Sequence, residues 1–161
     1  MKNQIEKFYG QLYFWVGQNE VCFSYYNEIH KAYKEEYCDV KWSDDDLTRE
    51  RLKEETTLTL DIGNKYIKQV EMNNDTIVNL IKNNYAYIDI DDIEIFQQFI
   101  LDYLRMKVEN NEDGRGIKTP FRIYSNLEKT VGNISYMRPE LIKRVKDKFE
   151  IKRKQLDKMT K

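Results

Sequence analysis

TLTLDIGNKYIKQV, residues 57–70, is the stretch that decides between the two fold classes open to this chain. Leu58, Leu60 and Ile62 alternate with other residues, as in a strand that leads into Asp61-Ile62-Gly63-Asn64. The same stretch also continues a helical pattern, because residues at steps of three and four from Leu52 to Val70 fall on one helix face. Its threonines favour a strand locally. Taken alone, residues 57–63 are compatible with helix, turn or strand.

The strand interpretation resembles the first phosphate loop of the actin-like and sugar-kinase fold, in which an Asp and a Gly-rich turn hold the phosphates of a nucleotide. That fold normally begins with this loop and needs more than twice the 161 residues of this chain, whereas here residues 1–56 come first and carry a helical pattern. A second Asp-Gly motif would have to be EDGRG at 112–116, which no predicted strand precedes. A phosphotransferase is therefore not expected, and no family resemblance extends beyond these residues.

The N-terminal segment is predicted to form one long helix. From about residue 3 to residue 37, apolar residues recur at steps of three and four, with Asn19 the one polar residue in register. Such a helix would span about 50 Å, and Gly10 and Gly17 are the places where we expect it to bend or break. The segment also holds ten of the 21 aromatic residues of the chain.

Helical periodicity also governs most of the remaining chain. We expect helices at 44–72, 76–82, 93–104, 120–131 and 139–159. Asn73, Asn74 and Asp75 are predicted to break the chain before the second of these, and residues 85–90 to form a turn or a brief strand. Leu104 and Met159 are placed on inward faces. The sequence thus predicts an all-α fold: a single-domain bundle of about five to six helices spanning residues 1–161.

Composition limits the class of protein further. The chain has 34% charged and 40% hydrophobic residues with only two prolines and six glycines, which is too apolar for disorder and too poor in turn residues for an all-β fold. Alanine is scarce and Lys, Asn and Ile are abundant, which indicates an AT-rich genome such as that of a low-GC bacterium or its phage. With no apolar run of about 18 residues, no membrane span is expected. Cys22 and Cys38, on one predicted helix, are too far apart to pair, and we expect a cytoplasmic protein.

Two acidic clusters could serve a metal-dependent hydrolase. They are Asp44-Asp45-Asp46 and the group of Asp89, Asp91, Asp92 and Glu94. Both stand where predicted helices begin, and carboxylates at those positions stabilise the positive end of the helix dipole without any ligand. His30 is the only histidine, so mechanisms that need two are excluded. We therefore expect no metal, no cofactor and no catalytic residue, and keep the hydrolase as an alternative.

Charge is unevenly distributed along the chain. Residues 138–161 hold ten Lys/Arg against four Asp/Glu, although the whole chain has a net charge of −1. Most of these cations have an acid four residues away, as on a solvated helix face. Lys148 and Lys152 do not, and they flank the apolar face. They could contact a partner, a nucleic acid or the acidic remainder of the chain itself.

Binding of nucleic acid or another anion is the second alternative. The loop DGRGIKTPFR at 113–122 combines two glycines with Arg115, Lys118 and Arg122 ahead of a predicted helix N-terminus, and Arg144 adds charge on the terminal helix. The isoelectric point near 6.0 lacks the basic footprint of a typical nucleic-acid binder.

The function favoured by the sequence is binding to another macromolecule without catalysis. The apolar arc of the first helix is wider than one packed face requires, because Phe14, Val21 and Tyr25 add a second edge, and aromatic residues are enriched at protein interfaces. We predict a bacterial or phage adaptor or regulatory protein that binds a protein partner or a second copy of itself. The predicted partner-binding residues are Tyr13, Phe14, Tyr25, Lys148 and Lys152.

Overall fold

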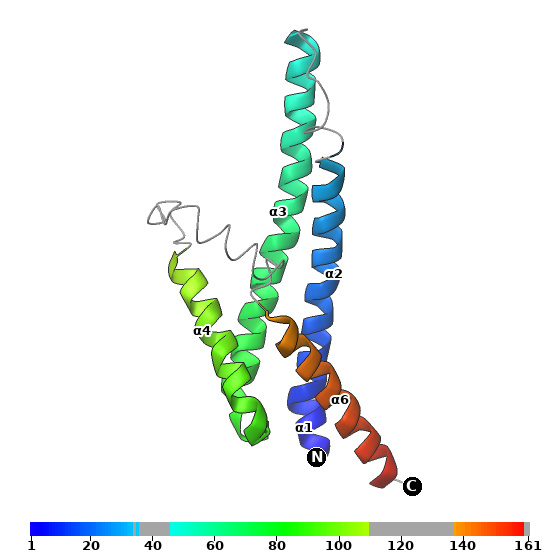
Figure 1. Ribbon diagram of the computed structural model, residues 1–161, viewed down its shortest axis with the longest axis vertical. Helices are drawn as coiled ribbons and strands as arrows, with labels where there is room; N and C mark the ends of the chain where they lie inside the picture. The colour runs from blue at the N-terminus through cyan, green and yellow to red at the C-terminus, as the bar shows by residue number, and fades with distance from the viewer. Residues whose placement is uncertain (34, 36–45, 110–136, 160–161) are drawn as a thin grey trace.

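The computed structural model describes residues 1–33, 35, 46–109 and 137–159, and these ranges contain helices and no strand. Four long helical segments make up this part of the chain (Figure 1). They are the N-terminal helix, composed of α1 (Lys2–Gln4), a π-helical turn (Ile5–Tyr9) and α2 (Gly10–Tyr33), followed by α3 (Asp46–Asn83), α4 (Ile93–Glu109) and α6 (Pro139–Met159). The all-α prediction is confirmed, but the described ranges hold four such helices rather than five to six. The helix predicted at 120–131 lies outside the described residues.

The long antiparallel pair of α2 and α3 forms the spine of the molecule (Figure 1). Residues 57–63 are helical, so the strand interpretation of this stretch is wrong. A Cβ atom built on Gly63 would lie 3.6 Å from the ring of Tyr26, so this face of α3 packs directly on α2. The hydroxyls of Thr57 and Thr59 donate to the carbonyls four residues earlier, both at 2.9 Å, which lets threonine remain inside a helix. Tertiary packing thus outweighs the local strand preference.

The break predicted at residues 73–75 is also wrong, because α3 continues without interruption to Asn83. Asn73 and Asn74 do not cap a helix but are buried against α2. Asn19 Nδ2 donates to Asn74 Oδ1 at 2.8 Å, and Asn73 Nδ2 donates to Asn19 Oδ1 at 2.9 Å. The one polar residue in the register of the first helix therefore has its partners in α3. Buried side-chain amides that satisfy each other fix the register of two helices.

This amide layer separates two apolar clusters. The smaller one, between α2 and α3, contains Cys22, Phe23 and Val70. The larger one lies where α4 and α6 join the spine, and it gathers buried residues of all four helical segments, among them Phe8, Leu12, Ile77, Phe96, Tyr103, Leu141 and Val145. Leu104 and Met159 were predicted to face inward but are exposed. Both stand toward the C-terminal ends of their helices, and α6 ends away from the other helices in Figure 1.

Gly10 marks the irregular point of the N-terminal helix. Its N–H donates to the carbonyl of Ile5, five residues back, at the end of the π-helical turn. A Cβ atom at residue 10 would lie only 2.7 Å from that carbonyl oxygen, so the turn requires glycine here. The helix is continuous through Gly17, where no interruption occurs.

The connection from α3 to α4 is made of two short 3₁₀ turns, Tyr85–Tyr87 and Ile90–Asp92, so the turn predicted at 85–90 is confirmed and the strand alternative is not. Asp89 lies between these turns in an extended conformation, and α4 begins at Ile93 as expected. This connection carries the acidic residues that α6 contacts.

Candidate functional site

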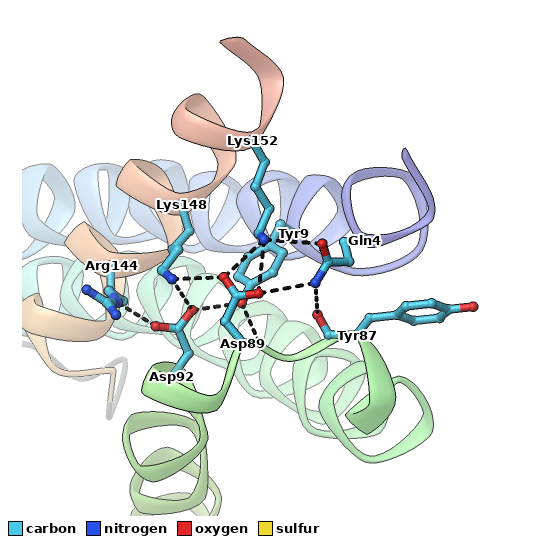
Figure 2. Close-up of polar contacts among 8 residues, drawn as sticks. All are labelled: Gln4, Tyr9, Tyr87, Asp89, Asp92, Arg144, Lys148 and Lys152. Carbon is cyan, nitrogen blue, oxygen red and sulfur yellow. Dashed lines mark hydrogen bonds and ion pairs between the residues drawn. The ribbon is translucent and has the colours of Figure 1, made fainter. Parts of the chain in front are cut away.

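The basic face of α6 meets the acidic connection between α3 and α4 (Figure 2). Arg144, Lys148 and Lys152 are four residues apart and therefore project from one side of the helix. All three point toward Asp89, which precedes the second 3₁₀ turn, and Asp92, which ends it, as Figure 2 shows. We call this group, with Gln4 and Tyr9, the docking cluster.

Short ion pairs hold the docking cluster together. Lys148 Nζ lies 2.8 Å from Asp89 Oδ2 and 3.5 Å from Asp92 Oδ2. Lys152 Nζ lies 3.0 Å from Asp89 and 3.3 Å from Gln4 Oε1. Arg144 Nε donates to the other oxygen of Asp92, whose side chain is fully buried. Both carboxylates are therefore shared between cations of α6.

Tyr9 links the cluster to the apolar core. Its hydroxyl donates to Asp92 Oδ2 at 2.7 Å and accepts from the backbone N–H of Asp89 at 3.1 Å. The ammonium group of Lys152 lies over the Tyr9 ring, 5.0 Å from its centroid. One buried aromatic side chain thus contacts both acids and one of the lysines.

The pKa shifts follow from burial and pairing. Burial alone would raise the pKa of Asp89, but hydrogen bonds from Lys148 and Lys152 outweigh it and hold that pKa below its ordinary value. Burial lowers the pKa of Lys148, yet the bond to Asp89 and the charges of both acids leave it raised. Burial, with the bond to Asp92, raises the pKa of Tyr9 well above its ordinary value, although its bond from the Asp89 amide acts the other way. At neutral pH Asp89 and Lys148 therefore keep their charges and Tyr9 keeps its proton.

This arrangement attaches α6 to the connection between α3 and α4. In the part of the chain that the structure describes, every buried side-chain polar atom has a hydrogen-bond partner. The acids of the cluster point at the lysines and the arginine of α6 (Figure 2). Its chemistry is that of a buried, mutually satisfied ionic contact between distant segments.

The acidic residues predicted for a metal separate into two places: Asp89 and Asp92 meet at Lys148, away from Asp91 and Glu94. Asp89 makes no capping hydrogen bond at the turn it precedes, so its role is that of a counterion of α6, not of a helix cap. Asp91 and Glu94 instead line a pocket of about 340 Å³ between α4 and α6. Within the described ranges, no group of three acidic, histidine or cysteine side chains could hold a metal ion. Asp44 and Asp45 lie outside those ranges.

The predicted binding residues separate into distinct places. Lys148 and Lys152 both pair with Asp89. Of the three contacts that the sequence left open for them, the structure thus shows the one with the acidic remainder of the chain. Arg144 pairs with Asp92, while Arg115, Lys118 and Arg122 lie outside the described residues. Tyr13 is partly exposed and stacks on Phe149 of α6, with centroids 4.5 Å apart.

Phe14 and Tyr25 lie on a different surface, the outer face of α2. Val21 lies seven residues after Phe14 and four residues before Tyr25, so the three share one side of the helix. The exposed fractions are 54% for Phe14, 48% for Val21 and 47% for Tyr25. Tyr25 also contacts Tyr66 of α3, with centroids 5.4 Å apart. This outer face is a stripe of large apolar side chains that the described helices leave half in solvent.

One signal for this face is present in the sequence but was missed. Between Lys7 and Glu28 the chain has a single charged residue, Glu20, although 34% of all residues are charged. Glu20 is paired with Lys146 of α6 at 2.7 Å. The outer face of α2 is therefore exposed and also free of charge, a combination that is unusual for a surface that meets only water.

The remaining reactive side chains show ordinary surroundings. Burial raises the pKa of the free thiol of Cys22, which suits an inert core residue, and Cys38 lies outside the described residues. His30 is exposed and stacks beside Tyr26 and Tyr33 on the surface of α2, with centroids 5.8 and 6.3 Å apart. Among the described helices, each is too short or too polar to cross a bilayer.

Comparison with known proteins gives no match: neither a family model, nor a curated protein, nor a solved structure is significantly similar to this chain. Function must therefore be inferred from the surfaces just described.

Proposed function

We propose that this protein acts by binding another protein through the outer face of α2, without catalysis. The observation that carries the proposal is the pairing of exposure with missing charge: Phe14, Val21 and Tyr25 are each about half exposed on a stretch whose single charge is neutralised by Lys146. Interface centres are depleted in charged residues and enriched in aromatic ones. A face of this composition gains free energy when a second apolar surface covers it.

The docking cluster supports this proposal by keeping α2 rigid. Gln4 and Tyr9, at the start of the N-terminal helix, are bound to the acidic connection and to α6. Further along, the amide layer ties Asn19 to α3. Phe14 lies between these two anchors and Val21 and Tyr25 follow Asn19 within two turns, so the stripe is presented on a helix that is attached at both places. A rigid face binds with a smaller loss of conformational entropy than a mobile one.

The setting we propose is the one that composition indicates: the cytosol of a low-GC bacterium, or of such a cell infected by a phage, where the protein would act as an adaptor or regulator. Scarce alanine with abundant lysine, asparagine and isoleucine, and the free thiol of Cys22, motivate this proposal.

Site-specific photo-cross-linking in cells that naturally express the protein tests the proposed function. A photoreactive phenylalanine analogue would replace Val21 or Tyr25 on the outer face of α2, and Leu101, which is 60% exposed on α4, serves as the matched control position. We expect protein adducts of defined mass at positions 21 and 25 and none at 101. Equal labelling at all three positions, or no protein adduct at 21 and 25, would contradict the proposal.

A further inference from the structure

We infer that the partner of the outer face of α2 is a second copy of this chain, docked antiparallel across a twofold axis near Gly17 and Gln18. This inference rests on the proposed function, because it names the partner of the same surface. Three properties of the helix lead to it: open space at Gly17, the symmetric placement of the large side chains, and the opposite charges of Lys7 and Glu28 at the two ends of the face.

Within the part of the chain that the structure describes, no neighbouring atom explains a glycine at residue 17. A glycine in a helix interior costs about 1 kcal/mol relative to alanine, and the other two glycines described in the helices have neighbours that explain or tolerate them. A Cβ atom at residue 17, in contrast, would meet nothing within 4 Å. Phe14 and Val21 stand on either side of it. A glycine flanked by large exposed side chains leaves a depression in which another helix can approach the backbone closely.

The spacing of the stripe is self-complementary in an antiparallel pair. With the twofold axis between residues 17 and 18, position 14 of one copy lies opposite position 21 of the other, so Phe14 meets Val21 on both sides of the axis. In the same register Tyr25 lies opposite Gly10, where the half-buried ring of Phe149 is available as an aromatic neighbour. Each large side chain thus faces a smaller one.

Charge complementarity selects the antiparallel direction. Lys7 and Glu28 stand at the two ends of the face, are both exposed, and lie opposite each other in this register, while Glu20 between them is paired with Lys146. Lys7 lies over the ring of Tyr87, 5.8 Å from its centroid, and Glu28 accepts a long bond of 3.4 Å from Ser24. The neighbouring charges are already used, since Lys2 pairs with Glu6 and Lys31 with Glu35. A parallel pair would place Lys7 beside Lys7 and Glu28 beside Glu28.

The size of the face predicts a weak dimer. From residue 7 to residue 28 the helix is about 32 Å long, and a strip about 10 Å wide covers roughly 300 Å² per copy. The total of roughly 600 Å² from α2 alone is below the roughly 1,200 Å² of a standard stable interface. Association should therefore depend on concentration over the micromolar range.

Sedimentation velocity of the purified full chain, from about 1 to about 200 µM, tests the inference because this range spans the dissociation of a weak complex. We expect the weight-average sedimentation coefficient of the parent to rise with concentration. Phe14→Lys and Val21→Glu should each weaken association at least about tenfold, as a charge placed against an apolar side chain must lose its water. The control Leu101→Glu should associate like the parent.

The double variant Phe14→Lys/Val21→Glu makes the test specific for the register. In the antiparallel dimer the introduced lysine of each copy faces the introduced glutamate of the other, so association should recover to within about threefold of the parent at low salt. In a parallel dimer like charges would meet and the loss would deepen. Far-UV circular dichroism confirms that each variant is folded, which is expected because both positions are exposed.

Three results would overturn the inference: a parent that stays monomeric throughout the range, single variants that associate like the parent, or a double variant that fails to recover. A monomeric parent whose positions 21 and 25 still cross-link to a different protein would overturn this inference and leave the proposed function standing. A monomeric parent without any adduct would remove both.

Discussion

Replacing Lys148 and Lys152 with glutamate should undock α6 and destabilise the fold. Both ammonium groups lie about 3 Å from Asp89, and their side chains are only 16% and 10% exposed. The double variant Lys148→Glu/Lys152→Glu would therefore place two new carboxylates beside two existing ones. Protonation or displacement of the helix is the only way to relieve that repulsion.

The magnitude follows from the burial of the partners. Removing one member of a buried ion pair costs about 3–5 kcal/mol. The cost in the docking cluster should be smaller, since Asp89 is 25% exposed and each acid retains a second donor when one lysine is lost. We therefore expect about 2 kcal/mol for Lys148→Met or Lys152→Met alone, and at least about 4 kcal/mol for the charge reversal of both. In a domain of this size 1 kcal/mol corresponds to about 2–4 °C in melting temperature, so the reversal should lower it by roughly 8–16 °C.

Thermal melts followed at 222 nm by circular dichroism measure this loss. The matched control is Lys143→Glu/Lys154→Glu, which makes the same change in net charge on exposed positions of the same helix and should alter stability by no more than about 0.5 kcal/mol. If the two double variants melt within about 2 °C of each other, the docking cluster does not hold α6 and the reasoning from its distances is refuted.

Three further changes probe the fold. Gly63→Ala should raise the free energy of unfolding by about 1 kcal/mol, because helix propensity improves and the new methyl group meets α2 at ordinary contact distance. Gly10→Ala should lower the free energy of unfolding by at least about 1 kcal/mol, because its methyl group would collide with the Ile5 carbonyl. Urea unfolding of the two variants should therefore show opposite shifts. Asn19→Leu should lower the free energy of unfolding by about 2–3 kcal/mol, since it removes the bonds that Asn19 makes with the buried amides of Asn73 and Asn74. Asn19→Asp at neutral pH should lower it by at least as much. Stability should be level from about pH 5 to about pH 9.5. Because the pKa of Asp89 is lowered in the folded state, its contribution to stability is present above about pH 4 and is lost below it; because the pKa of Tyr9 is raised, its contribution is present below about pH 10 and is lost above it. Urea midpoints that stay flat through about pH 11 would contradict the assignment of Tyr9.

Local periodicity was sufficient to predict most helices. The start of α6 at Pro139, the start of α4 after Asp92 and the long N-terminal helix all follow from spacing and end signals in the sequence. The stretch at 57–70 could not be decided in this way, because a strand and a helix both fit its residues. Its packing against α2 settles it, and that packing involves residues some 35 positions earlier in the chain.

The asparagines show why a local rule failed. Asn73 and Asn74 carry the composition of a helix break, since asparagine often ends helices and caps new ones. The alternative, a buried amide layer, requires a third amide at the right height on another helix. Asn19 is identifiable from the sequence as the polar exception in its own helix. Neither segment alone predicts that Asn19 contacts Asn73 and Asn74. Joining them requires the antiparallel register of α2 and α3.

A side chain that finds no partner nearby in sequence can find it in solvent, in a distant segment or in another molecule. Lys148 and Lys152 lacked acid neighbours along their helix and found them 59 and 63 residues away in Asp89, so the apparent partner surface of α6 is consumed by folding. The outer face of α2 is the opposite case. After the described helices have packed, Phe14 and Val21 still have about half of their surface in water, and Glu20 is the single charged residue of their own helix between Lys7 and Glu28. We therefore propose that another molecule covers these apolar side chains, and the open space that a Cβ atom at Gly17 would meet leads us to propose a helix as its docking element.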